Sequence, residues 1–109
     1  MYVNFEAGNK QYKLRLNTRN IIALEKVLGV NPLHIFNTQE DRLPPITQMV
    51  AVLHAALQQY QHNISMSDAY DIFDSYIEDG HSVDEFVFII LDIYRESGII
   101  PKEVDTEKN

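Results

Sequence analysis

The chain has 109 residues, of which 45% are hydrophobic and none is cysteine. This length suits one compact domain, and the lack of cysteine excludes a disulfide framework, a thiolate zinc site and a cysteine nucleophile. Residues 1–42 carry six basic and four acidic groups, whereas residues 43–109 carry three basic and twelve acidic groups. The acidic part disfavours nucleic-acid binding. The asymmetry can favour head-to-tail self-association, although a solvated acidic surface is the simpler explanation.

Neither a secretory signal nor a membrane-spanning segment is expected. The first twenty residues lack an apolar core region, and no run of about 18 apolar residues exists. A β-hairpin is predicted over residues 2–16, because apolar residues alternate with polar ones on both sides of a Gly8-Asn9 turn signal. These apolar residues are Val3, Phe5, Tyr12, Leu14 and Leu16. An isolated hairpin is marginal in water, so it must pack on the helices or extend a sheet in another subunit.

Helical periodicity follows over residues 18–98. The first helix begins with Asn17 or Thr18 as its N-cap and ends at Gly29. Asn31-Pro32 begins a further short helix, and a polar loop follows over residues 37–43. A second helix is predicted from Pro44-Pro45 to about residue 61, with an apolar stripe that runs from residue 46 to residue 60.

Two more helices complete the predicted bundle. The third begins after Ser67 as its N-cap and ends at Gly80, and the fourth runs from Val83 to about Ser97. Ser82 and the glutamate three residues later fit a capping box at the start of the fourth helix. The sequence thus predicts a mainly helical α+β fold, with a hairpin and about four helices in one domain over residues 1–100. Residues 101–109 are predicted to form a flexible tail.

The stretch between Arg42 and Asp68 contains no Asp, Glu, Lys or Arg. The second helix would therefore have an outer face without charge, which loses little free energy when it leaves water. That face consists of Gln48, Ala51, Ala55, Gln58 and Gln59. We interpret it as a contact face for a partner, because small residues let a second backbone approach closely. The alternative is a central helix that its own neighbours cover.

A second candidate contact lies on the fourth helix. On a helical wheel Phe88 falls outside the main apolar stripe, on the side of Asp84 and Arg95, and Ile89 flanks the opposite edge. Together Phe88 and Ile89 widen the apolar face beyond what one core requires.

No residue pattern predicts catalysis, a cofactor or a metal. The acidic residues between 71 and 84 do not fit a calcium loop, because Ile77 would occupy a ligand position. The histidines lack zinc-site spacing, and neither a nucleophile elbow nor a phosphate-binding loop occurs. We therefore expect a protein that acts by contact and is not an enzyme.

Three segments resemble small tail assembly chaperones of long-tailed (siphovirus-type) phages and prophages of Gram-positive bacteria. These segments read YKLRLNTRNIIALEKVLGVNPLHIF, VLHAALQQYQHNISMSDAYDIFDSYIEDG and IYRESGII. The shared features are a hairpin, a Leu-Glu-Lys-x-Leu-Gly helix, a helix pair rich in aromatic residues and small size. The resemblance extends from about residue 2 to residue 100.

This resemblance implies a homo-oligomeric, non-catalytic protein of the bacterial host cytoplasm that is absent from the finished virion. Such proteins hold the tape measure protein, a very long helical chain, while the tail tube assembles around it. One alternative is an acidic regulator that mimics nucleic acid and blocks a basic protein. Another is a small metal-dependent enzyme that uses the acidic residues around Asp79.

Overall fold

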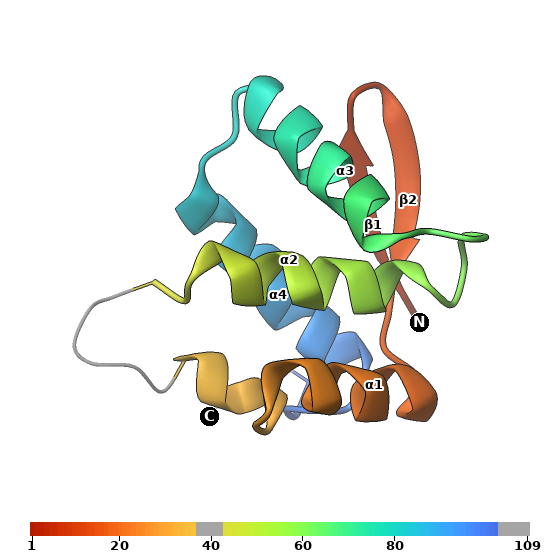
Figure 1. The fold of residues 1–109 in the computed structure, drawn as a ribbon, viewed down its shortest axis with the longest axis vertical. Coiled ribbons are helices and arrows are strands. Elements are labelled where there is room, and N and C mark those ends of the chain that lie inside the picture. Colours follow the sequence, from red (N-terminus) through yellow and green to blue (C-terminus); the bar gives the residue numbers. More distant parts are fainter. Residues whose placement is uncertain (37–42, 103–109) are drawn as a thin grey trace, which may run out of the picture.

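The computed structural model describes residues 1–36 and 43–102. Within these ranges an antiparallel hairpin precedes four α-helices and one 3-10 helix, which confirms the predicted mainly helical α+β fold (Figure 1). The elements are β1 (Val3–Ala7), β2 (Lys10–Leu14), α1 (Thr18–Leu28), η1 (Pro32–Phe36), α2 (Ile46–Leu57), α3 (Met66–Glu78) and α4 (Val83–Glu96). Most of the predicted loop, at residues 37–42, and most of the predicted tail, at residues 103–109, lie outside the described residues.

Capping boxes set the starts of three helices. Asn17, one of the two predicted candidates, caps α1, and Ser82 caps α4 as predicted. Each exchanges hydrogen bonds with the residue three positions later. The prediction that Ser67 caps the third helix is wrong. The Ser65 hydroxyl accepts from the Asp68 backbone N–H at 3.0 Å, and the Asp68 carboxylate accepts from the Ser65 backbone N–H at 2.9 Å. Because this exchange satisfies two free N–H groups, α3 begins at Met66.

The hairpin lies on the helices, which is one of the two placements predicted for it. Gly8 and Asn9 both have positive φ angles, 60° and 66°, as a two-residue type I′ turn requires. Phe5 pairs with Tyr12, and the side of the hairpin that carries Phe5 and Leu14 is buried against α2, α3 and α4. Burial of this side supplies the stability that an isolated hairpin lacks.

The outer edge of β2 is covered by a side chain that follows α2. The Gln61 amide accepts from the Lys13 backbone N–H at 2.8 Å and donates to the Lys13 carbonyl at 2.9 Å. The amide thereby takes the hydrogen-bonding place of a neighbouring strand. Helix α2 ends at Leu57, so the predicted end near residue 61 is wrong; that residue binds the hairpin instead.

Helix α2 is the central element of the fold. It contacts α1, α3, α4 and β2, and eight of its twelve residues are buried. The predicted apolar stripe is too long, because Ile46 is 52% exposed and Tyr60 is 40% exposed. Ile46 occupies the first turn of the helix and Tyr60 lies beyond its last turn, where the period of 100° per residue no longer applies.

The core between the hairpin, α3 and α4 is aromatic. The ring of Phe86 lies 5.8 Å from Phe5, 5.2 Å from Phe73 and 5.6 Å from Tyr76, each in an edge-to-face arrangement. Edge-to-face pairs add about 0.5–1.5 kcal/mol to the stabilisation from area burial. This cluster therefore holds the hairpin to the helical part of the domain.

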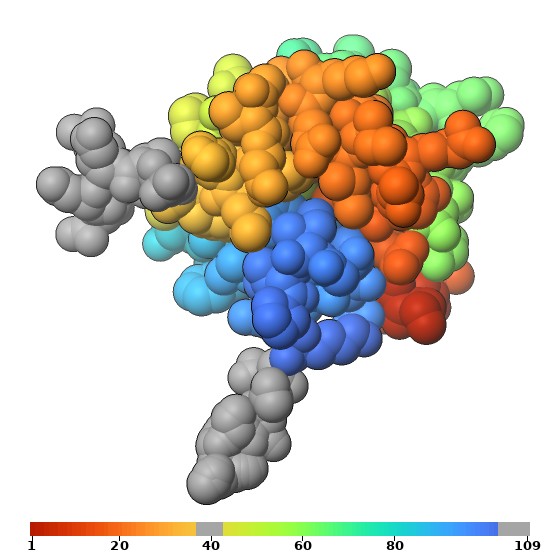
Figure 2. All heavy atoms as spheres, turned by 90° about the horizontal axis from the view of Figure 1, so that it is seen from below, coloured from red at the N-terminus to blue at the C-terminus, as the bar shows by residue number. Residues whose placement is uncertain are grey.

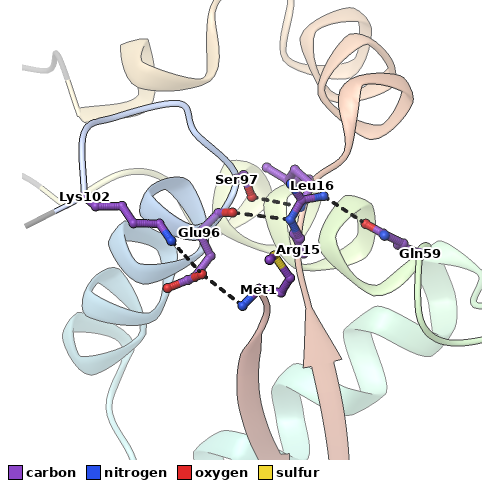
Figure 3. Close-up of polar contacts among 7 residues, drawn as sticks. All are labelled: Met1, Arg15, Leu16, Gln59, Glu96, Ser97 and Lys102. Atoms are coloured by element: carbon purple, nitrogen blue, oxygen red, sulfur yellow. Dashed lines mark hydrogen bonds and ion pairs between the residues drawn. The ribbon is translucent and has the colours of Figure 1, made fainter.

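Two further contacts connect distant parts of the chain to α4. The buried Tyr94 hydroxyl donates to the Pro32 carbonyl at 2.9 Å, which ties η1 to α4, and burial raises the pKa of this phenol. At the base of the hairpin the Glu96 carboxylate lies 3.3 Å from the Met1 amino group and 3.5 Å from Lys102 Nζ (Figure 3). The hydrogen bond from the Met1 amino group is the main cause of a lowered pKa at Glu96.

Candidate functional site

The predicted contact face of α2 is only partly exposed. Ala51 and Ala55 are 5% and 6% exposed, Gln48 and Gln58 are half-buried, and Gln59 is exposed. The predicted exposure of the two alanines is wrong, because α1 of the same chain crosses α2 at these positions. For these two residues the alternative applies, in which neighbouring elements of the fold cover a central helix. Their small side chains let α1 approach closely.

The crossing of α1 over α2 leaves a groove that is partly open to solvent. Its cavity volume is about 80 Å³, and no charged residue lines it. The lining residues are Asn20, Ala23, Leu24 and Val27 of α1, Ala51, His54 and Ala55 of α2, and Gln58 and Met66. We call this surface the α1–α2 groove. Three of the five residues predicted on the second helix line it, whereas Gln48 and Gln59 do not.

The size of the α1–α2 groove suits one side chain. A closed cavity of about 150 Å³ holds a free benzene molecule, so about 80 Å³ is too small to enclose a whole ring. Because the groove is partly open, an aliphatic side chain or the edge of an aromatic ring can enter while its base stays outside. The chemistry that the groove offers is the desolvation of apolar surface.

The polar side chains of Gln58 and His54 in the groove form hydrogen bonds with backbone carbonyls of the same chain. The Gln58 amide donates to the His54 carbonyl at 2.8 Å and to the Ile64 carbonyl at 3.0 Å. The His54 ring Nε2 lies 3.2 Å from the same Ile64 carbonyl. Because both amide hydrogens of Gln58 already form hydrogen bonds, this end of the groove offers a ligand mainly apolar contacts.

Helix α1 supplies exposed apolar residues that the sequence analysis did not assign to a site. Val27, which lines the groove, is 62% exposed, and nearby in the sequence Ile22 is 47% and Val30 is 40% exposed. Figure 2 shows α1 and η1, in orange, covering one face of the molecule beside the blue end of α4. One signal in the sequence would have found Ile22, since at 100° per residue it points about 160° away from Leu24 and so lies outside the apolar stripe of the helix.

The second predicted contact is a separate surface. Phe88 is 68% exposed and Ile89 is half-buried, and neither lines the α1–α2 groove. Phe88 points outward from α4 among exposed carboxylates. A hydrogen bond with the Ser82 hydroxyl is the main cause of a lowered pKa at one of them, Asp84.

Several acidic residues near α3 have structural contacts. Asp68 caps α3, and the Asp79 carboxylate accepts from the Gly8 backbone N–H at 2.8 Å. The ring of His81 stacks on Tyr76 with its centroid at 4.4 Å. Within residues 1–36 and 43–102, no group of three or more His, Asp or Glu side chains is arranged to hold a metal ion.

The chain is thus a small α+β domain with a largely apolar groove between α1 and α2 that no Asp, Glu, Lys or Arg lines. Residues 3–108 match a family of unknown function, DUF6096, and the chain belongs to that family. Neither a curated protein nor a solved structure is significantly similar to the chain. Among the described residues no helix is long and apolar enough to cross a membrane.

Proposed function

We propose that this protein is a non-catalytic assembly chaperone that binds a long helical chain, in the role of the phage tail assembly chaperones that it resembles. The partner is the tape measure protein during tail morphogenesis in the bacterial host cytoplasm. The chaperone acts as a homo-oligomer and is absent from the finished virion. The observation that carries this proposal is the α1–α2 groove, an uncharged apolar surface on an otherwise acidic chain.

The α1–α2 groove suits a helical partner of varied sequence. An amphipathic helix that lies in a groove is held by apolar side chains spaced along one face. Val27, Ala51 and Met66 offer such side chains apolar contacts without requiring one particular charge, and methionine adapts its shape readily. The groove therefore tolerates differences along a long chain.

A single groove of this size binds weakly, because about 80 Å³ holds one anchoring side chain. Many copies bind side by side along one long helix, so together they cover its apolar face even though each contact is weak. Weak individual contacts also permit release when tube subunits replace the chaperone. A long apolar helix that is covered in this way is kept from aggregating.

The test is co-expression with the very long helical protein encoded next to this chain, followed by sizing of the complex. The informative variant is Val27→Glu, which places a charge at the mouth of the groove on a side chain that is already 62% exposed. Ile22→Glu is the matched control, because Ile22 is exposed on the same helix but does not line the groove. We expect the wild type and the control to keep the partner in solution and Val27→Glu to bind about tenfold more weakly.

Equal binding by Val27→Glu and the wild type would contradict the role of the groove. A partner that is equally soluble without the chaperone would contradict the proposed function itself.

Exposed carboxylates on α3 favour one second candidate, an acidic regulator that mimics nucleic acid. Asp71, Asp74 and Glu78 are all exposed there. This candidate requires binding to a basic protein that weakens steeply with salt and is unchanged by Val27→Glu.

A further inference from the structure

Phe88 is an exposed aromatic side chain within an acidic stretch of α4. It is 68% exposed. At 100° per residue, Asp84 and Asp92 lie one turn before and one turn after it, each within about 40° of its direction. Both carboxylates are exposed, and Arg95 Nη1 lies 3.0 Å from the Asp92 carboxylate. The surface around Phe88 therefore combines one apolar anchor with negative charge, most fully at Asp84.

One margin of the α1–α2 groove, on the outer side of Ala23, has the opposite charge. Arg19 and Lys26 are exposed, and at 100° per residue both lie about 40–60° from Ala23, on its side away from Val27. Glu25 points about 160° away from Ala23, so its carboxylate does not neutralise the positive charges of Arg19 and Lys26. Neither basic residue forms an ion pair within the part of the chain that the structure describes.

We propose that a second copy of this chain docks on the α1–α2 groove, with its Phe88 ring edge in the groove and its Asp84 beside Arg19 and Lys26. The groove is uncharged inside and basic at one margin, and Phe88 is apolar with acidic neighbours. The two surfaces are thus complementary in both apolar character and charge. This contact specifies the interface of the homo-oligomer in the proposed function, and in that respect it rests on the proposed function. It forms in the absence of the helical partner.

The contact is heterologous, because Phe88 belongs to α4 and the groove to α1 and α2. A molecule that docks in this way still has a free groove and a free Phe88, so association continues into a ring or an open filament. The helical partner and the second copy compete for the same groove. Self-association therefore covers the groove until a long helix occupies it.

The test measures mass against protein concentration by sedimentation equilibrium, up to about 1 mM protein. The wild type is expected to rise well above 12.6 kDa in low salt and to return toward this mass in 1 M salt, where exposed charges are screened. Phe88→Ala is expected to weaken association at least fivefold. Tyr70→Ala is the matched control, because Tyr70 is 57% exposed on α3, and it should associate like the wild type.

A charge-reversal arm tests the contact without changing Phe88. Asp84→Lys and Lys26→Glu should each weaken self-association about fivefold, and an equimolar mixture of the two should recover most of it. Recovery follows because the introduced lysine of one variant then faces the introduced glutamate of the other, while the unaltered Asp84 and Lys26 still pair.

A wild type that stays at 12.6 kDa throughout would overturn the inference, as would unchanged association in Phe88→Ala or a mixture that recovers nothing. Capture of the helical partner by Phe88→Ala separates this outcome from failure of the proposed function. Loss of capture without any change in self-association would make Phe88 a partner contact and reject the docking.

Discussion

The two sides of α2 are packed in opposite ways. At 100° per residue, Met49, Leu53 and Leu57 lie on one side of the helix, and all three are fully buried. The other side carries Ala51 and Ala55 under α1, where a space of about 80 Å³ stays open. Atoms that line an unfilled space lose dispersion contacts, so this side of α2 contributes less to the stability of the fold. A ligand that fills the space would restore those contacts. The closed core and the proposed binding surface thus lie on opposite sides of one helix.

The largest expected effect is on the open side, at the alanines beneath α1. The double variant Ala51→Glu/Ala55→Glu should lose its cooperative thermal transition, because two unpaired carboxylates would be buried at a cost of more than about 4 kcal/mol. Circular dichroism during heating measures this. Ala23→Glu lines the same groove at an exposed position and should unfold within about 1 kcal/mol of the wild type. A double variant as stable as Ala23→Glu would show that α1 does not cover the alanines.

The next effect is in the aromatic cluster. Phe86→Ala removes a fully buried ring that contacts three other rings, so the free energy of unfolding should fall by about 3–5 kcal/mol. Urea denaturation measures the change. Phe88→Ala, the same substitution two residues later on an exposed ring, should change it by less than about 0.5 kcal/mol. Similar losses in the two variants would contradict the distinction between the closed core and the exposed face of α4.

The smallest effect concerns the exposed contacts at the base of the hairpin. The pKa of Glu96 is lowered from its ordinary value of 4.5, so its ionised form stabilises the fold above this pH. This contribution is lost as the pH falls through the lower pKa of the folded state. Melting temperatures of the wild type and Glu96→Gln should therefore differ slightly at neutral pH and converge in acid. A difference in melting temperature that grows as the pH falls would contradict this prediction.

Local signals in the sequence predicted the elements well. The Gly8-Asn9 turn, the caps at Asn17 and Ser82 and the stop at Gly29 all depend on residues within a few positions of one another. The misplaced start of α3 was also a local error. Ser65 has an aspartate three residues later and therefore forms a capping box, whereas Ser67 has no such partner.

The α1–α2 groove could be predicted only in part. A charge-free stretch shows that α2 is covered, but a covering helix of the same chain and one of a partner leave the same pattern in the sequence. The sequence therefore predicts Ala51 and Ala55 as contact residues, but it does not predict that α1 of the same chain covers them. The role of Gln61 was not predictable either, because its bonds to Lys13 cross 48 positions of sequence.

The most direct test of the central claim is amide hydrogen exchange, measured on the wild-type protein alone and in complex with the long helical partner. If the open side of α2 is the binding surface, added protection should be concentrated in α1 and α2, at residues such as Ala23, Val27 and Ala55. The hairpin and α3 should exchange as they do in the free protein. Added protection confined to the hairpin and α3, with α1 and α2 unchanged, would contradict the account.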